Sequence, residues 1–237
     1  MILAGGLGTR LRGVVPGLPK ALAPVAGRPF VSLLLEHIQR CGGRRVVLAL
    51  GHKADAVERA LGQRYAGEVE LVYSREERPA GTGGALALAA RLVRTADLVA
   101  MNGDSIVLED LAAVCAGHRA AGADLTMVTV PVPDAGRFGS VVVREDGRVV
   151  GIAEKGSAGP GVVNAGIYVM GAGLARGFAV PSSLERDVLP VLVARTVRAH
   201  ASSRPFIDIG TPESYRRAQE QAERHAPGVR PARRQGQ

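Results

Sequence analysis

Hydrophobic and polar positions along the first half of the chain follow two periods in turn, one typical of strands and one of helices. Short apolar runs predict buried strands at residues 1–4, 45–50, 69–73 and 97–101. Segments with helical spacing lie between them and predict helices at residues 29–40, 55–61 and 84–93. Strand–helix–strand units repeated in this way predict a parallel sheet with helices on both faces.

The second half of the chain changes its pattern. β-Branched and apolar runs predict strands at residues 125–130, 140–143, 162–170 and 205–209, with a hairpin signal at Asp146-Gly147 and a helix at 185–195. Thr211, Pro212 and Glu213 open a final helix as cap, first-turn proline and N-terminal acid. The sequence therefore predicts one domain over residues 1–225, a three-layer α/β/α Rossmann-like fold with a mixed, mostly parallel sheet. Residues 226–237 are expected to form a disordered basic tail.

The net charge of +8 first suggests a nucleic-acid partner, but its distribution argues against one. Aromatic residues are only 3% of the 237 residues, with no tryptophan to stack on bases. Residues 1–45 hold seven basic and one acidic side chain, and residues 216–237 hold six basic and two acidic ones. The stretch between them holds 17 basic and 19 acidic side chains. The excess is therefore concentrated at the two ends, and neither a nucleic acid nor a membrane is expected as partner. A basic binding module remains the alternative, and salt-sensitive retention on DNA or RNA would reveal it.

Several other classes of protein are disfavoured. Two cysteines, Cys41 and Cys115, are too few for a disulfide framework or a four-cysteine zinc site, and the five histidines share no metal-ligand spacing. The sequence has no apolar run of 18 residues and no charged leader before its first apolar run, so we expect a cytoplasmic protein. That apolar run begins at Met1 itself, which leaves open a start further upstream.

The first candidate for chemistry is the glycine-rich turn after the first predicted strand. GGLGTR occupies residues 5–10, and Lys20 follows ten residues later. Glycines after a strand let the backbone approach an anion, and Arg10 and Lys20 add positive charge that suits a polyphosphate. The pattern matches neither the Walker A loop nor the dinucleotide-binding GxGxxG motif. The alternative is an ordinary turn with surface cations.

Two aspartates in apolar surroundings form the second candidate. Asp104 follows the strand predicted at 97–101, and Asp208 stands within the apolar segment FIDIG at 206–210. Acids at the carboxyl ends of parallel strands lie where open α/β sheets bind ligands. Two carboxylates from separate strands would hold Mg²⁺ with few protein ligands and leave its other positions to phosphates and water. The alternative for Asp104 is a helix cap.

The chain resembles the sugar nucleotidyltransferases, which make NDP-sugars from an NTP and a sugar 1-phosphate. LAGGLGTRLR and LPKALAPVAGRPF resemble the signature of this family. The likeness covers residues 1 to about 220 and continues in the family's order through GTGGAL at 81–86, NGD at 102–104, EK at 154–155, NAG at 164–166 and IDIGTPESY at 207–215. The resemblance implies the fold of the nucleotide-diphospho-sugar transferases.

The resemblance also assigns roles to residues. It implies catalytic roles for Arg10, Lys20 and Asp104, and Mg²⁺ bound by Asp104 and Asp208. It implies that the nucleotide is bound by Leu3, Ala4, Gly5, Gly6, Gly8, Thr9, Glu76, Glu77, Gly81 and Thr82. It implies that the sugar phosphate is bound by Gly139, Glu154, Lys155, Asn164 and Gly166. We expect direct in-line attack without a general base, because the second pKa of a sugar phosphate lies near 6 by analogy with phosphorylated side chains.

The identities of the nucleotide and of the sugar can be narrowed further from single residues and short motifs. A carboxylate accepts hydrogen bonds from both the ring N–H and the exocyclic amine of guanine, so Glu76 or Glu77 favours GTP, unless both acids are solvated loop charges. The single short domain, RPF after the signature and FIDIGTPESY resemble the D-glycero-D-manno-heptose 1-phosphate guanylyltransferases. Mannose 1-phosphate is the alternative sugar, and a uridylyl- or thymidylyltransferase the alternative within the family.

A protein of another class, a catalytically silent subunit that binds a nucleotide-sugar, is a further alternative. Intact Arg10, Lys20, Asp104 and Asp208 speak against it, because a silent copy would not need all four. The sequence leaves the oligomeric state open, a homo-oligomer included.

Overall fold

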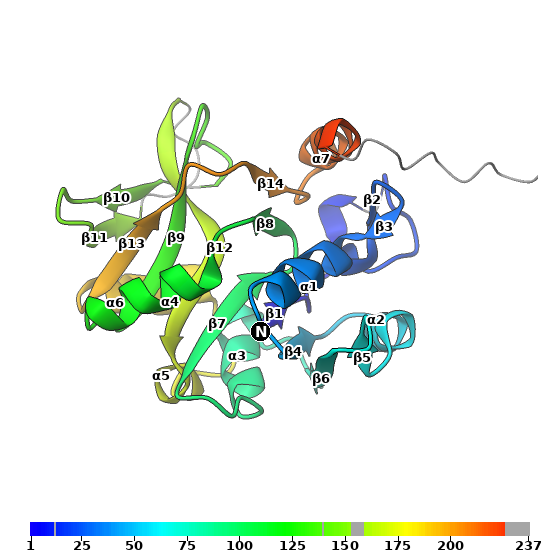
Figure 1. Cartoon of the computed structure of the whole chain (residues 1–237), viewed down its shortest axis with the longest axis horizontal. Coiled ribbons are helices and arrows are strands. Elements are labelled where there is room, and N and C mark those ends of the chain that lie inside the picture. The colour runs from blue at the N-terminus through cyan, green and yellow to red at the C-terminus, as the bar shows by residue number, and fades with distance from the viewer. Residues whose placement is uncertain (12, 139, 153–158, 226–237) are drawn as a thin grey trace, which may run out of the picture.

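A twisted eight-stranded sheet runs through the computed structural model, which describes residues 1–11, 13–138, 140–152 and 159–225 (Figure 1). Its order is β13-β9-β12-β7-β1-β4-β6-β5. The pairs β13–β9, β7–β1, β1–β4 and β4–β6 are parallel, whereas β12 runs antiparallel to both of its neighbours and β5 to β6. The strands are β1 (Ile2–Leu3), β4 (Arg45–Leu50), β5 (Arg64–Tyr65), β6 (Val69–Arg75), β7 (Asp97–Asn102), β9 (Leu125–Val132), β12 (Gly161–Gly171) and β13 (Val197–Ala201).

Helices cover both faces of this sheet and form two separate apolar cores. One core joins the sheet to α1, α2, α4 and α7, and the other joins it to α3, α5 and α6. The helices are α1 (Phe30–Arg40), α2 (Ala54–Leu61), α3 (Gly81–Ala90), α4 (Leu111–Ala120), α5 (Ala172–Arg176), α6 (Leu189–Val193) and α7 (Pro212–His225). None of the helices in the described part of the chain is long and apolar enough to cross a membrane.

Alternation along the central strands explains why both faces are apolar. In β4, Val46 and Leu48 belong to the first core, while Val47 and Ala49 face α3 on the other side. Successive side chains of a strand point to opposite faces, so a strand buried on both sides is a continuous apolar run. The predicted three-layer α/β/α architecture with a mixed sheet is confirmed.

Three small two-stranded sheets extend the main one: β2 (Pro24–Val25) with β3 (Arg28–Pro29), β8 (Ser105–Val107) with β14 (Phe206–Asp208), and β10 (Val141–Val143) with β11 (Val149–Ile152). The last pair is the hairpin predicted at Asp146-Gly147. Helix α7 begins as predicted, because Thr211 Oγ1 accepts a hydrogen bond from Ser214 N at 3.2 Å. It packs on the β2–β3 hairpin, where the Tyr215 hydroxyl donates to Pro24 O.

The structure corrects the helix predicted at residues 185–195. A single π-helical turn (Leu184–Val188) precedes α6, which ends at Val193. Val188 N donates to Ser183 O, five residues earlier, at 3.2 Å. Pro190 has no N–H to donate and cannot sit in a helix interior without breaking the ladder. The predicted helix is therefore present over residues 184–193, with a π-helical first half and an end two residues earlier than predicted.

Helix α4 and strand β13 are among the elements that the sequence analysis did not predict. Helix α4 is capped by Asp110, whose side chain accepts from Ala112 N at 2.9 Å and from Ala113 N at 3.2 Å. An aspartate before an apolar run was the signal for it. Strand β13 gives a weaker signal, because Arg198 and His200 interrupt its five residues.

Gly103 allows the loop after β7 to pass closely beside β1, and this contact predicts a stability effect. A Cβ on Gly103 would lie 2.6 Å from Leu3 O, a backbone atom that cannot move freely. We expect Gly103→Ala to lower the free energy of unfolding by about 1–3 kcal/mol through overpacking. Urea unfolding followed by circular dichroism measures the change.

Gly117 provides the matched control for this substitution. It lies inside α4, and a Cβ there would meet nothing within 4 Å. We expect Gly117→Ala to stabilise the protein by roughly 0.5–1 kcal/mol, because alanine is the better helix former. Loss of stability in Gly117→Ala equal to that in Gly103→Ala would contradict the steric explanation.

Candidate active site

A cavity of about 580 Å³ opens at the carboxyl ends of the parallel strands β1, β4, β6 and β7. Open α/β sheets bind their ligands at this edge. Of the residues predicted as sites, the cavity is lined by Leu3, Ala4, Gly5, Gly6, Lys20, Glu76, Glu77, Gly81, Thr82 and Asp104. The structure therefore brings together residues that are up to 101 positions apart in the sequence, from Leu3 to Asp104.

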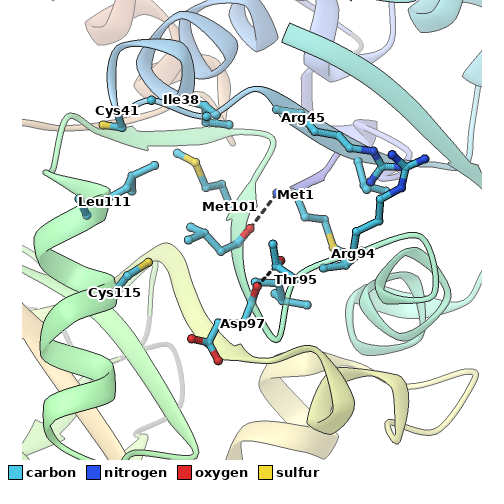
Figure 2. Close-up of a pocket in the computed structure, with 18 residues that line it drawn as sticks. Met1, Ile38, Cys41, Arg45, Arg94, Thr95, Asp97, Met101, Leu111 and Cys115 are labelled. Atoms are coloured by element: carbon cyan, nitrogen blue, oxygen red, sulfur yellow. Dashed lines mark hydrogen bonds between the residues drawn. The ribbon is translucent and has the colours of Figure 1, made fainter.

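A second cavity, of about 360 Å³, lies at the opposite ends of β4 and β7, beside Met1 (Figure 2). Apolar side chains from α1, α4 and the strands make most of its wall. The two free cysteines, Cys41 and Cys115, also line it. Its charged residues are Arg45, Arg94 and Asp97, and Asp97 is engaged by Arg119 at 2.8 Å. Because the first cavity contains both the glycine-rich turn and several carboxylates, we take that cavity as the candidate active site.

Lys20 and Asp104 meet inside the candidate site. Lys20 Nζ donates to Asp104 Oδ2 at 2.5 Å, and the two side chains are 18% and 38% exposed. Lys20 reaches this position because the glycine-rich turn packs closely on it: a Cβ on Gly8, whose φ is +59°, would lie 3.3 Å from Lys20 Cβ. The predicted catalytic lysine and the predicted metal ligand are thus direct partners.

The two glutamates before Gly81 occupy different environments. Glu76 is half-buried, accepts from Ala80 N at 2.8 Å, and lies so close to the turn that a Cβ on Gly5 would be 2.6 Å from its Oε1. Burial raises the pKa of Glu76 above its ordinary value, and the hydrogen bond from Ala80 N–H opposes that shift. Glu77 lines the same cavity and is exposed. Glu76 is therefore the fixed carboxylate of the pair.

Gly81 and Thr82 connect the start of α3 to the π-helical turn. Gly81 has φ +71°, and a Cβ on it would overlap Ser182 O, so only glycine fits. The Thr82 hydroxyl donates to Glu185 Oε2 at 2.7 Å and accepts from Leu184 N at 2.8 Å. Glu185, which the sequence did not indicate as a site residue, thereby becomes part of the cavity wall.

Asn164 and Gly166 lie behind the loop that carries Asp104. Asn164 Nδ2 donates to the hydroxyl of fully buried Tyr168 at 2.6 Å, and burial raises the pKa of that tyrosine. A Cβ on Gly166, whose φ is +78°, would come within 2.9 Å of Asn102 atoms. This close approach of β12 to the end of β7 places both predicted sugar-phosphate residues next to the cavity, although neither lines it.

Asp208 lies one strand away from Asp104. Strands β8 and β14 pair so that Asp208 stands opposite Ser105, and Ile209 N donates to Asp104 O at 2.8 Å. Asp208 forms an ion pair with Arg137 and is 13% exposed. Carboxylate oxygens are the donors that Mg²⁺ prefers, and this ion commonly uses only one or two of them from the protein. The described residues contain no cluster of three or more His, Cys, Asp or Glu side chains that could hold a metal ion.

Some predicted residues do not line the cavity or cannot be placed. Gly8, Thr9 and Arg10 do not line the cavity, and Thr9 and Arg10 are exposed. Gly139, Glu154 and Lys155 lie outside the described residues. Among the cavity residues, His52, Arg78, Asn102 and Glu185 were not predicted as site residues, and only Asn102 had a signal, through the NGD motif.

Comparison with known protein families matches residues 1–225 to the family described as "Nucleotidyl transferase". A D-glycero-alpha-D-manno-heptose 1-phosphate guanylyltransferase of Aneurinibacillus thermoaerophilus is 36% identical over 228 residues, which cover 95% of this chain and 98% of that protein. A mannose-1-phosphate guanylyltransferase of Mycobacterium tuberculosis is 35% identical over 91% of this chain, but the match covers only 62% of that protein.

Solved structures give a consistent result. HddC from Yersinia pseudotuberculosis superposes with a TM-score of 0.83 at 32% identity, covering 93% of this chain and 97% of HddC. The same protein complexed with GMP-PN gives a TM-score of 0.82. A putative glucose-1-phosphate thymidylyltransferase from Bacillus anthracis has a TM-score of 0.84 at 22% identity and supports the fold alone.

Proposed function

Because this chain belongs to the nucleotidyl transferase family, we propose that it is a sugar 1-phosphate guanylyltransferase that converts GTP and D-glycero-α-D-manno-heptose 1-phosphate to GDP-heptose and pyrophosphate. The observation that carries the proposal is the cavity at the carboxyl edge of the sheet, where the glycine-rich turn, Lys20, Glu76 and Asp104 meet. Two relatives named as guanylyltransferases, at 36% and 35% identity, support the nucleotide.

The reaction needs positioning and charge stabilisation more than proton transfer. An oxygen of the sugar phosphate attacks the α-phosphorus of GTP, the bond to the bridging oxygen breaks, and its electron pair leaves with pyrophosphate. The attacking phosphate has a second pKa of about 6, by analogy with phosphorylated side chains, and needs no base at neutral pH. Lys20 would stabilise charge around the α-phosphate, and the glycine turn would hold the phosphates through its N–H groups.

Asp104 and Asp208 would hold Mg²⁺, and this part of the proposal rests on the chemistry of their oxygens and on the pairing of β8 with β14. When bound, Mg²⁺ would neutralise charge on the phosphates. Lys20, whose ammonium contacts Asp104, would exchange this carboxylate for phosphate oxygens when the nucleotide binds. Arg10, which is exposed, would face the leaving pyrophosphate.

Glu76 would recognise the guanine base through hydrogen bonds. Its Oε2 already accepts from Ala80 N, which fixes the carboxylate beside the glycine turn, and an ionised carboxylate retains lone pairs for both guanine donors. Gly81 and Thr82 would line the same side of the nucleotide. Adenine offers no ring N–H on this edge, and uracil and thymine offer only one donor, so the arrangement favours GTP.

Asn164 and Gly166 would bind the sugar phosphate, together with Gly139, Glu154 and Lys155 of the family pattern. The heptose assignment is supported by the relative that this chain matches over 98% of its length. Mannose 1-phosphate is the second candidate, because the mannose-1-phosphate guanylyltransferase is nearly as similar over the part that it shares.

A substrate matrix tests the proposed function. Five NTPs are combined with a panel of sugar 1-phosphates that includes the heptose and mannose compounds, and pyrophosphate release is measured. We expect the highest kcat/KM with GTP and the heptose phosphate. A higher rate with UTP or dTTP for every sugar would contradict the role of Glu76, and no release with any pair would indicate a silent binding subunit.

Glu76→Gln tests base recognition directly. The new side-chain oxygen would keep the bond from Ala80 N–H, so its NH₂ group would turn toward the guanine donors. We expect kcat/KM for GTP to fall about 10- to 100-fold, the result of a lost acceptor and an unsatisfied donor. Steady-state kinetics with GTP and UTP measures the effect.

Glu77→Gln is the matched control, since it makes the same chemical change at the exposed neighbour. We expect it to alter kcat/KM for GTP less than about threefold, as for a solvated surface charge. If Glu77→Gln lost the preference for GTP while Glu76→Gln kept it, the assignment would pass to Glu77.

A further inference from the structure

Three side chains beside Asp208, those of Arg137, Phe138 and Phe206, have no part in the mechanism above. Arg137 donates a guanidinium hydrogen bond to Asp208 Oδ1, and the two side chains are 30% and 13% exposed. The guanidinium carbon of Arg137 also lies 4.6 Å from the centre of the Phe138 ring. Arg137 is thus held by a carboxylate and an aromatic face together.

The aromatic support is tied to the strand that carries Asp208. Phe138 packs edge-on against Phe206, with 5.4 Å between ring centres and an interplanar angle of 60°. Phe206 and Asp208 are two residues apart in β14 and therefore share one face of the strand. Two of the four phenylalanines in the chain therefore lie beside Arg137.

The backbone after Asp208 passes close to its carboxylate. A Cβ on Gly210 would lie 3.0 Å from Asp208 Oδ2 and 3.3 Å from Oδ1. Glycine at this position lets the carboxylate lie close to the chain that follows it. Arg137 therefore contacts a carboxylate that already lies against its own backbone.

We propose that Arg137 is a positioning residue that fixes Asp208 for cation binding by holding Oδ1 and leaving Oδ2 available. A carboxylate has about four lone-pair sites on its two oxygens, so it can accept from Arg137 and still bind a metal ion. The contact with Phe138 keeps the guanidinium in place whether or not a metal is bound. The proposal rests on the proposed function only in that Asp208 binds a divalent cation there.

In the alternative role, Arg137 competes with the metal ion for Asp208 and must leave this carboxylate before the metal binds. The two roles differ in the sign of one measurement. Removal of a positioning residue weakens metal binding, and removal of a competitor strengthens it. The Phe138–Phe206 support favours positioning, because an arginine that had to leave would lose both its ion pair and its aromatic contact.

Arg137→Gln tests the proposal in a titration of the nucleotide-free protein with Mn²⁺. The electron paramagnetic resonance signal of free Mn²⁺ measures how much of the ion is bound. Mn²⁺ suits the same carboxylate donors as Mg²⁺. We expect Arg137→Gln to weaken Mn²⁺ binding about 10-fold, the usual cost of removing a residue that orients a metal ligand. The Mg²⁺ concentration for half-maximal activity should rise in parallel, with little change in KM for GTP.

Two further variants separate positioning from folding. Arg137→Lys keeps the charge but not the planar fork and should restore part of the Mn²⁺ affinity. Phe138→Leu keeps Arg137 but removes its aromatic support and should give an intermediate loss. Arg119→Gln breaks another arginine–aspartate pair, to Asp97 at the start of β7, and should leave Mn²⁺ binding unchanged.

Tighter Mn²⁺ binding by Arg137→Gln would identify Arg137 as a competitor and overturn the proposal. Unchanged binding, or a wild-type protein that binds no Mn²⁺, would overturn it as well. Failure of the proposed function is distinguishable, because it appears as missing pyrophosphate release or another preferred NTP in the wild-type protein. The Mn²⁺ measurement needs neither GTP nor a sugar phosphate.

Discussion

Asp104→Asn is expected to lower kcat for pyrophosphate release by about 10²- to 10³-fold, the loss that follows removal of a group that stabilises charge in a transition state. Asparagine has nearly the shape of aspartate but no charge, so it would bind Mg²⁺ weakly and would replace the ion pair to Lys20 Nζ, now 2.5 Å long, by a neutral hydrogen bond. The fold should be intact because this side chain is 38% exposed and caps no element. Pre-steady-state and steady-state pyrophosphate release measure the effect.

Asp110→Asn is the matched control for that substitution. Asp110 caps α4 by accepting from Ala112 N and Ala113 N, and asparagine caps helices about as well as aspartate. We expect nearly unchanged kcat and thermal stability. Near-normal turnover in Asp104→Asn would contradict the metal assignment, because a metal ligand cannot lose its charge without a large change in rate.

The central fold was predictable because its strands are buried on both faces. β4 and β7 are mostly continuous apolar runs, a pattern typical of strands buried on both faces. The start of α7 was predictable as well, because Thr211 caps its first turn. β13 was not predictable, since it is a short parallel strand whose pairing with β9 comes from the tertiary fold. The helix predicted at 185–195 is present, but its first turn is π-helical, since Pro190 has no N–H for an α-helical bond.

The site was predictable only where its residues share a motif. The glycine-rich turn, Lys20 and Asp104 lie in short segments whose residue types already suggest anion binding or metal binding. Glu185 and Arg137 carry no such signal, because their partners Thr82 and Asp208 are 103 and 71 positions away. Contacts of that range depend on the register of strands and the placement of loops, which local patterns do not determine.

Lys20→Met is expected to lower kcat/KM by about 10²- to 10³-fold, because a fixed positive charge beside the reacting phosphate would be replaced by an apolar chain of similar length. The Lys20 side chain is 18% exposed, so its hydrocarbon part is largely packed and methionine should preserve that packing. Lys53→Met is the control. Lys53 is exposed and donates to Gly17 O at 2.6 Å, and its loss should cost little activity.

The Lys20–Asp104 contact also predicts how Lys20→Met combines with Asp104→Asn. Because the two side chains touch, their substitutions should not act independently. Removal of either group already disrupts the arrangement on which the other depends, so Lys20→Met combined with Asp104→Asn should lose much less than the product of the single effects. Pyrophosphate release from the four proteins of this cycle measures the coupling. Multiplicative losses would mean that Lys20 and Asp104 act at separate points of the reaction, and that their ion pair has no part in preparing the site.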